Sequence, residues 1–281
     1  MKKLLLKLIC CAPIICSLEA QAQELFLYKE IDTVKLYLEV YSPPAVEDAK
    51  LSPAMVFFFG GGWKSGSREH FIHHAKYFSQ RGIVCFLADY RTFNKHQTDP
   101  FTSLNDAKSA MRYVRAHVEK FGIDPNKIIA SGGSAGGHLA AATALIKAYD
   151  DPSDDLLVSC VPNALVLFNP VIDNGPGGYG FERVGEAYDD FSPLHNIRAG
   201  APPTIMLLGT NDHLIPVETG EYYTKIMERV GSRCDLMLYE GGKHGFFNYR
   251  NIEFYKETVA AADRFLQSLG YLSDEPIVEI K

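Results

Sequence analysis

The sequence predicts an α/β fold in which a mostly parallel β-sheet is covered by helices on both faces. Short apolar, β-branched runs alternate with amphipathic stretches along most of the 281 residues. Many of these runs are continuously apolar, which is typical of strands that are buried on both faces. Glycine-rich turns follow several of them directly. Ligands of such sheets bind at the carboxyl ends of the strands, so these turns are the expected location of a site.

The first residues have the pattern of an export signal. A basic start, Met1 to Lys3, precedes an apolar stretch that ends at Cys16, and Ala20 to Ala22 fits the small-x-small cleavage pattern. We therefore expect a signal peptide over residues 1–22, a single domain over residues 23–281, and a periplasmic or secreted protein. The apolar stretch is too short to span a bilayer, and no small residue precedes a cysteine in it as lipidation requires. No stable membrane insertion is expected.

Composition argues against several classes of partner. The net charge is −6 and the chain has no basic run, so nucleic acid and anionic membranes are poor candidates. Three cysteines remain after the signal, at Cys85, Cys160 and Cys234. Their odd number and apolar surroundings favour small buried residues over a disulfide framework, although one pair in an oxidising compartment stays open. The oligomeric state is not indicated.

Apolar patterning predicts the elements of the first half. Alternation over Leu25 to Tyr41 indicates two strands of a hairpin at one edge of the sheet. The continuous runs Ala54 to Phe59 and Ile83 to Ala88 indicate buried strands. Arg68 to Arg81 is helix-like, and Ser103 to Phe121 has the spacing of an amphipathic helix.

Two polar clusters in the chain invite a metal, and neither is assigned one. His70, His73 and His74 have helical spacing that would bring imidazoles to one face. No carboxylate or thiolate partner is apparent, so a solvated helix face is expected. The acidic loop from Asp151 to Asp155 is likewise expected to be a solvated turn rather than a calcium site.

The stretch from Asn126 to Ala148 holds the strongest local signal. A short β-branched run precedes a G-x-S-x-G at Gly132 to Gly136, and an Ala/Leu-rich helix pattern starts at Ala135. A serine at such a strand-to-helix corner is held out on a tight turn, and flanking glycines let the helix pack close behind it. The N–H of Ala135 then lies at a helix N-terminus, where negative charge is favoured. Ser134 is therefore the candidate nucleophile.

Two further segments are assigned to the substrate. Gly60 to Gly62 directly follow a predicted buried strand, so their bare amides can approach a ligand, as an oxyanion loop requires. The long segment Asp173 to His195 is rich in glycine and aromatics, and we interpret it as a lid and part of the pocket. Trp63, Tyr179 and Phe181 are assigned to substrate binding, with plain packing over the sheet as the equal alternative for the lid aromatics.

The second half of the chain supplies a base and an acid. The remaining patterns predict a strand over Ala164–Val171, strands over Thr204–Leu208 and Cys234–Tyr239, and helices over Val217–Val230 and Ile252–Leu269. A serine needs a base to take its proton, and that base needs an anion to orient it. His244 and Asp212 follow neighbouring strands and fit these roles. Asp89 is the competing acid, but we expect it to pair locally with Arg91. Activity should fall on acidification as His244 becomes protonated.

These motifs resemble those of the α/β-hydrolase superfamily, in its hormone-sensitive-lipase-like and carbohydrate-esterase-like group. The residues that carry the resemblance are Gly60–Trp63, Asp89–Arg91, Gly132–Gly137, Gly209–Asp212 and Lys243–Gly245. The resemblance implies an α/β-hydrolase fold with about eight strands and a small loop lid, and no cofactor. It also implies that Gly61, Gly62 and Ala135 supply the oxyanion N–H groups. The family's loop usually begins with a histidine where this chain has Phe59, so a different brace is expected.

The resemblance further implies an exported serine esterase that removes O-acetyl or other short acyl groups from a glycan or small-molecule ester. Its alternatives stay open. An exopeptidase of the prolyl-peptidase-like type usually carries a propeller domain, which this chain is too short to hold. An arylformamidase-like amidase fits the motifs but not export. A non-catalytic hydrolase-fold binding protein usually lacks one of the three residues found here.

Overall fold

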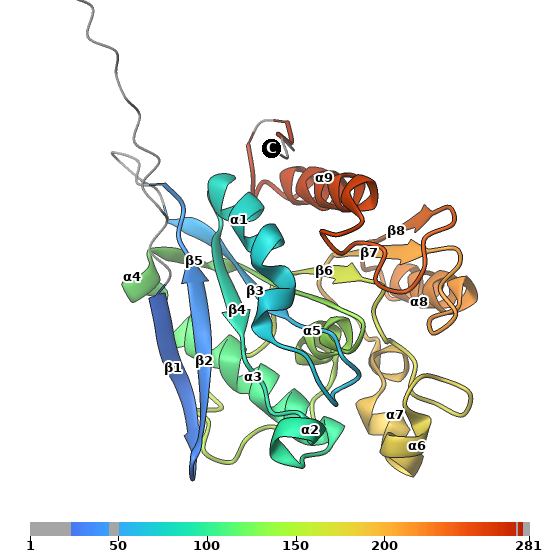
Figure 1. The fold of residues 1–281 in the computed structure, drawn as a ribbon, viewed down its shortest axis with the longest axis horizontal. Helices are drawn as coiled ribbons and strands as arrows, with labels where there is room; N and C mark the ends of the chain where they lie inside the picture. Colours follow the sequence, from blue (N-terminus) through green and yellow to red (C-terminus); the bar gives the residue numbers. More distant parts are fainter. Residues whose placement is uncertain (1–23, 45–50, 274, 278–281) are drawn as a thin grey trace, which may run out of the picture.

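The computed structural model describes residues 24–44, 51–273 and 275–277, so the expected signal peptide lies outside the described residues. The described strands form one sheet of eight, in the order β1-β2-β4-β3-β5-β6-β7-β8 (Figure 1). Their bounds are β1 Glu24–Ile31, β2 Val34–Tyr41, β3 Ser52–Phe58, β4 Val84–Ala88, β5 Ile123–Gly133, β6 Ala164–Phe168, β7 Thr204–Gly209 and β8 Cys234–Tyr239. Strand β2 pairs antiparallel with β1 and β4, and the other pairs are parallel. The predicted parallel sheet with an edge hairpin is confirmed.

Helices cover both faces of this sheet because its strands are apolar on both sides. In β3, Met55 and Phe57 belong to one apolar cluster, while Ala54, Val56 and Phe58 belong to the other. Helices α1 and α9 pack over the first cluster, and α3, α5 and α8 over the second (Figure 1). Their bounds are α1 Ile72–Gln80, α3 Pro100–Ala116, α5 Ala135–Leu145, α8 Val217–Arg229 and α9 Ile252–Ser268.

Two predicted boundaries shift for local reasons. The predicted helix at 103–121 starts earlier, at Pro100, because Asp99 accepts a hydrogen bond from the Thr102 amide at 2.8 Å and proline suits the first turn. It then breaks at His117, after which the short α4 covers Val118–Phe121. Strand β5 is longer than its apolar run, since pairing with β6 continues to Gly133.

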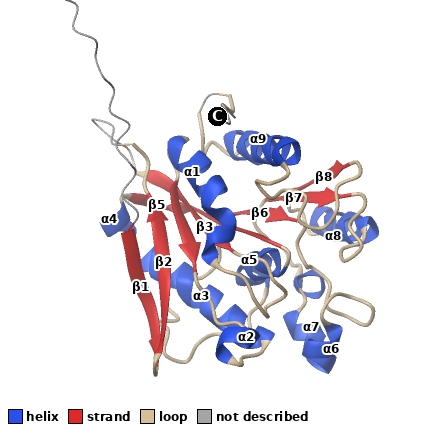
Figure 2. Cartoon of the chain, viewed as in Figure 1, coloured by secondary structure: helices blue, strands red, loops and turns tan. Residues whose placement is uncertain are grey.

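The predicted lid consists of a loop followed by four short helices in close succession (Figure 2). They are α6 Phe181–Val184, η2 Gly185–Ala187, α7 Tyr188–Phe191 and η3 Pro193–Asn196. The two ends of the segment are joined, because the Ser192 hydroxyl donates to the Ile172 carbonyl at 3.0 Å and accepts from the Asn174 amide at 3.1 Å. Buried His138 of α5 bonds through Nε2 to the Phe191 carbonyl at 2.9 Å. The lid is therefore anchored to the helix that follows Ser134.

The acidic loop at residues 151–155 differs from the solvated turn that was expected. Asp151 forms an ion pair with Lys29 at 2.6 Å, and Asp154 forms one with Arg112 at 3.0 Å. These cations neutralise the carboxylates. Within residues 24–44, 51–273 and 275–277, no group of three metal-binding side chains comes together.

Two other expectations concern the described residues as a whole. Cys85 and Cys160 are buried free thiols, as expected, and Cys234 is a half-buried one. Among the described residues, no helix has both the length and the hydropathy that a membrane span requires.

Candidate active site

Ser134 occupies the turn between β5 and α5 in a strained conformation. Its φ and ψ are 55° and −122°, outside the regions that side-chain-bearing residues favour. The turn is fixed from both sides, because the Ser134 N–H donates to the Phe168 carbonyl at 3.0 Å and its own carbonyl accepts from the amides of His138 and Val171. A Cβ on Gly136 would lie 2.0 Å from the Phe58 carbonyl oxygen, so only glycine permits this close packing against β3.

The structure joins the three predicted side chains in one hydrogen-bonded chain. His244 Nε2 lies 2.8 Å from Ser134 Oγ, and His244 Nδ1 lies 2.8 Å from Asp212 Oδ2. The side chain of Asp212 is fully buried, while that of His244 is 26% exposed. The imidazole therefore reaches the surface where a substrate arrives, and its acidic partner is shielded from water.

Backbone amides hold Asp212 in place. Its Oδ1 accepts from the amides of Leu214 at 2.9 Å and Ile215 at 3.0 Å, which leaves Oδ2 for the histidine. These bonds fix the orientation of the carboxylate. The turn after β7 thus presents an oriented anion to the imidazole.

The competing acid has a different partner from the one expected. Arg68 donates to both carboxylate oxygens of Asp89, at 2.9 and 2.8 Å, and the Tyr37 amide donates to Oδ2 at 3.2 Å. Arg91, the partner expected from the sequence, instead forms a two-bond pair with Asp106. Asp89 is thus committed to a structural ion pair away from His244.

The glycine loop after β3 has conformations that other residues rarely adopt. Gly61 has φ +126° and Gly62 has φ +63°. An added Cβ would lie 2.1 Å from the Ser65 carbonyl oxygen at Gly61 and 2.7 Å from the Tyr179 hydroxyl at Gly62. In the described part of the chain, neither glycine N–H donates a hydrogen bond to another group. The Ala135 amide belongs to the first turn of α5, where helices leave N–H groups unpaired. Gly61, Gly62 and Ala135 therefore keep free donors.

A different brace replaces the expected loop histidine, and sequence reasoning missed it. The Gly60 amide donates to His70 Nδ1 at 3.0 Å, and His70 Nε2 lies 2.5 Å from Asn248 Oδ1. Burial lowers the pKa of His70, which favours the neutral ring. Because Nδ1 accepts from the Gly60 amide, the proton of the neutral ring lies on Nε2. Asn248 in turn donates to the Gly245 carbonyl at 2.7 Å. One chain of hydrogen bonds thus links the glycine loop to the residue after His244.

Phe59 contributes to the same brace by stacking. Its ring lies parallel to that of Tyr90 at a centroid distance of 3.9 Å, and the Tyr90 hydroxyl donates to the Phe59 carbonyl at 2.7 Å.

The expectation of a solvated face for the three nearby histidines fails for His74, which is 1% exposed among aromatic rings. Only His73 is exposed, and it stacks on Tyr249.

The aromatic residues assigned to the substrate divide into two groups. Trp63 is 1% exposed and packs edge-on against His138, so direct contact with a substrate does not match its burial. Tyr179 is half-buried, and its hydroxyl lies next to Gly62. Phe181 is half-buried and contacts Tyr188. Trp63 packs against Tyr179 and Phe191 of the lid, and Tyr179 lies beside Gly62.

Arg183 of the lid was not identified from the sequence. Its guanidinium lies over the rings of Trp63 and Tyr179, at 5.1 and 5.2 Å, and Nη1 donates to the Gly62 carbonyl. Only 17% of this side chain is exposed. Arg183 of the lid therefore helps to hold the glycine loop in place.

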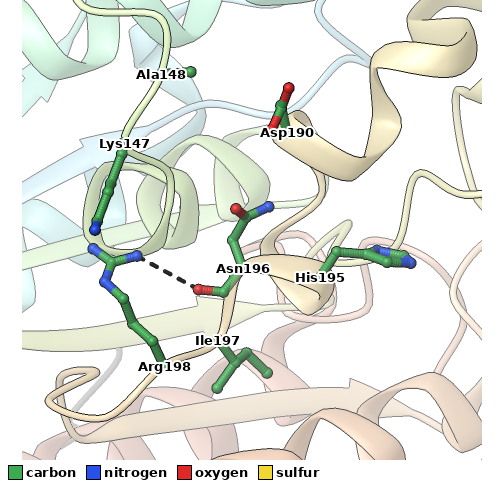
Figure 3. A pocket seen from close by; sticks show the side chains of 7 residues that line it. All are labelled: Lys147, Ala148, Asp190, His195, Asn196, Ile197 and Arg198. Atoms are coloured by element: carbon green, nitrogen blue, oxygen red, sulfur yellow. Dashed lines mark hydrogen bonds between the residues drawn. The ribbon is translucent and has the colours of Figure 1, made fainter.

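A hollow beside the carboxyl end of α5 is not part of this site. Its volume is about 400 Å³, and Figure 3 shows its lining side chains, with Lys147 and Arg198 extending toward the same region. Arg198 donates to the carbonyls of Ala144 and Leu145, so it caps the carboxyl end of α5. Ser134 precedes the other end of that helix, roughly 16 Å away at 1.5 Å per residue.

Comparison with protein families gives two matches. Residues 38–173 match the BD-FAE family model, and residues 179–274 match the dienelactone hydrolase family model. The acetylxylan esterase of Xylanibacter ruminicola is 28% identical over 279 residues, which cover 90% of this chain and 51% of that protein. The probable isoprenylcysteine alpha-carbonyl methylesterase of Oryza sativa is 27% identical over 234 residues, covering 74% of this chain and 54% of that protein. The chain spans about half the length of these curated relatives.

Solved structures give a fuller match. The apo form of Thermogutta terrifontis esterase 2 is 42% identical, with a TM-score of 0.86, covering 90% of this chain and 97% of that one. The form phosphonylated by sarin matches at 41% identity and a TM-score of 0.86, with the same coverage. The fold, the strained serine turn and this relative lead to one conclusion. The chain belongs to the α/β-hydrolase superfamily, among the hormone-sensitive-lipase-like esterases, a group of hydrolases that act on carboxylic ester bonds.

Proposed function

We propose that this protein is an exported serine carboxylester hydrolase that removes O-acetyl or other short acyl groups from carbohydrates. The observation that carries the proposal is the hydrogen-bonded chain from Asp212 through His244 to Ser134, with both distances at 2.8 Å. A serine becomes nucleophilic when a base accepts its proton, and an oriented base needs a fixed anion on its other nitrogen. In this proposal, the free amides of the glycine loop and of α5 donate hydrogen bonds to the oxyanion that forms in the same reaction.

In the proposed mechanism, Ser134 Oγ attacks the ester carbonyl while its proton passes to His244 Nε2. Asp212 stabilises the imidazolium that forms. The carbonyl oxygen becomes an oxyanion, which accepts hydrogen bonds from Gly61, Gly62 and Ala135. Collapse of this intermediate breaks the ester bond, and the leaving alcohol takes the proton from His244. Water then repeats the sequence on the acyl-serine and releases the acid.

Relatives support the acyl and substrate class. Thermogutta terrifontis esterase 2 has been solved with propionate bound and with butyrate bound, both of which are short acids. The Xylanibacter ruminicola relative is an acetylxylan esterase. The expected export signal at residues 1–22 would agree with a substrate outside the cytoplasm. Together these favour short-chain esters of glycans.

The first test is acetate release from acetylated polysaccharides by the chain without residues 1–22, against a Ser134→Ala control. We expect release by the parent protein and a loss of about 10⁴-fold or more in the variant. Release that persists in the variant contradicts the assignment of Ser134. If glycans yield no acetate while p-nitrophenyl acetate is cleaved, the chemistry stands and the carbohydrate specificity is rejected.

A further inference from the structure

A small cavity of about 140 Å³ lies between the lid and the turn after β7. Its walls are Ile172, Asp173, Gly177, Gly178, Tyr179, His213, Leu214, Ile215, Pro216 and Thr219. Two of these residues, Leu214 and Ile215, hold Asp212 through their amides. A third, Ile172, follows Val171, whose amide donates to the Ser134 carbonyl at 3.1 Å. The cavity therefore adjoins the triad on the side of Asp212.

The cavity combines one carboxylate and the imidazole of His213 with apolar side chains. Asp173 Oδ1 accepts from the Gly175 amide at 2.9 Å, which fixes the orientation of the side chain. Within the described residues, Asp173 forms no ion pair, so its other oxygen is available to a donor in the cavity. Tyr179 and Leu214 supply flat and aliphatic surface around it. A ligand ring that carries hydroxyl donors and has apolar C–H faces matches this combination of a carboxylate acceptor and apolar surface.

The size and charge of the cavity further restrict the class of ligand that it can bind. Its volume is below the roughly 300–1,000 Å³ of sites for drug-sized ligands, so it suits one small group rather than a long chain. A carboxylate repels anions and accepts strong hydrogen bonds from hydroxyls. A neutral sugar is therefore favoured over a uronic acid or a phosphorylated sugar.

We propose that this cavity binds the neutral sugar ring that carries the acyl group, with Asp173 accepting a hydrogen bond from a ring hydroxyl. The inference rests on the proposed function, since it assigns the alcohol side of the same reaction. Asp173 acts here as a specificity residue for the leaving group and takes no part in bond cleavage.

Asp173→Asn is the sharpest variant because the asparagine keeps an oxygen for the Gly175 amide, while the other oxygen, the proposed sugar acceptor, becomes an NH2 donor and the charge is lost. Glu186→Gln is its matched control, since Glu186 is exposed on the same lid and does not line the cavity. Thr219→Leu is a second variant, which fills the cavity without changing its charge. Three quantities are measured: inhibition of p-nitrophenyl acetate hydrolysis by free methyl xyloside, KM for acetylated methyl xyloside, and kcat/KM for p-nitrophenyl acetate alone.

We expect Asp173→Asn to weaken xyloside inhibition and to raise KM for the acetylated xyloside about tenfold, the loss of one hydrogen bond to a charged group. Its kcat/KM for p-nitrophenyl acetate should stay within about twofold of the parent value. In Glu186→Gln, the kinetic constants for both substrates should also stay within about twofold of the parent values. Thr219→Leu should weaken xyloside inhibition in the same selective way.

Two results would overturn the cavity assignment. One is an equal loss on both substrates in Asp173→Asn, which indicates a structural role, and the other is no change on either. If the parent binds free xyloside but releases no acetate from its ester, the proposed carbohydrate function fails while the sugar site stands. If it releases acetate and neither variant alters sugar binding, the function stands and the site fails.

Discussion

At the scale of single residues, the site depends on groups whose backbone is fixed before any substrate arrives. Ser134 is held at a positive φ by its bonds to Phe168 and Val171, and Asp212 by two amides. Preorganised groups of this kind reorganise little during the reaction. The cost is backbone strain at Ser134, which close packing of β5, α5 and β3 offsets.

His138 is a buried residue whose protonation makes the stability of the fold depend on pH. It is fully buried behind the lid, and this burial lowers the pKa of its imidazole to about 3 from the ordinary 6.5. The unfolded chain therefore binds a proton between pH 6.5 and 3 that the folded chain does not. Stability from neutral His138 is complete above pH 6.5 and is lost as pH falls toward 3.

We predict that His138→Gln flattens the acid dependence of the unfolding free energy. Glutamine keeps a donor for the Phe191 carbonyl but cannot be protonated. From pH 7 to pH 5, the parent should lose about 2 kcal/mol more than the variant. Urea denaturation at several pH values measures both slopes. The other buried histidines, such as His74, remain in both proteins and cancel in the difference. Parallel curves would contradict the assignment.

The arrangement of the three candidate catalytic residues could be predicted from sequence because each of them follows a strand in a short, glycine-rich motif. Strand ends gather at one edge of a parallel sheet, so local pattern and topology suffice to bring Ser134, Asp212 and His244 together. His70, Asn248 and Arg183 have no such local signal. Their roles come from contacts with residues 10, 178 and 121 positions away. No pattern within one segment contains that information.

At the scale of elements, three separate segments support the glycine loop. Tyr90 follows β4, His70 precedes α1, and Arg183 belongs to α6, and each bonds to a different residue from Phe59 to Gly62. Together they supply the rigidity that the family's usual loop histidine would give. The loop's identity was predictable from its glycines, whereas its brace required the packing of these three elements.

We predict that Arg183→Met lowers kcat about tenfold while KM for p-nitrophenyl acetate changes little, because a loosened loop weakens contacts made in the transition state. Methionine keeps the contact with Trp63 and loses the bond to the Gly62 carbonyl. Arg183→Lys keeps a donor and should recover part of kcat. Steady-state kinetics at constant pH separate kcat from KM.

Glu182→Gln is the matched control for this prediction. Glu182 pairs with Arg183 at 3.0 Å but is 68% exposed, so its loss should leave kcat unchanged. A purely structural role for Arg183 would instead lower the melting temperature and reduce the active fraction without a selective fall in kcat. Equal kcat in Arg183→Met and the parent would exclude the proposed support of the loop.

At the scale of the whole molecule, a buried ion network joins the edge hairpin to the body of the fold. Asp106 of α3 is fully buried and pairs with Lys29 of β1 at 2.9 Å and with Arg91 at 2.7 Å. Lys29 also reaches Asp151 in the loop after α5. The expected solvated acidic turn is therefore part of this network. Charge alone did not reveal it, because the partners lie 77 and 122 positions apart in the chain.

We predict that Asp106→Ala destabilises the protein by about 3–5 kcal/mol, because it leaves two cations with little exposure short of a counter-ion. Urea denaturation at pH 7 measures the change. Asp235→Ala is the matched control, since its pair with Arg233 is partly exposed, at 34% and 42% of the two side chains, and should be worth about 1 kcal/mol or less. Where both variants remain folded, kcat should equal that of the parent, since Asp106 contacts no member of the triad. The double variant Arg91→Met, Asp106→Ala should regain part of the lost stability, because the cation that pairs with Asp106 alone among the described carboxylates is also removed. If the single variant loses less than the control, the network contributes no more than an exposed pair, and the hairpin must be held by its apolar contacts with α3 and α4.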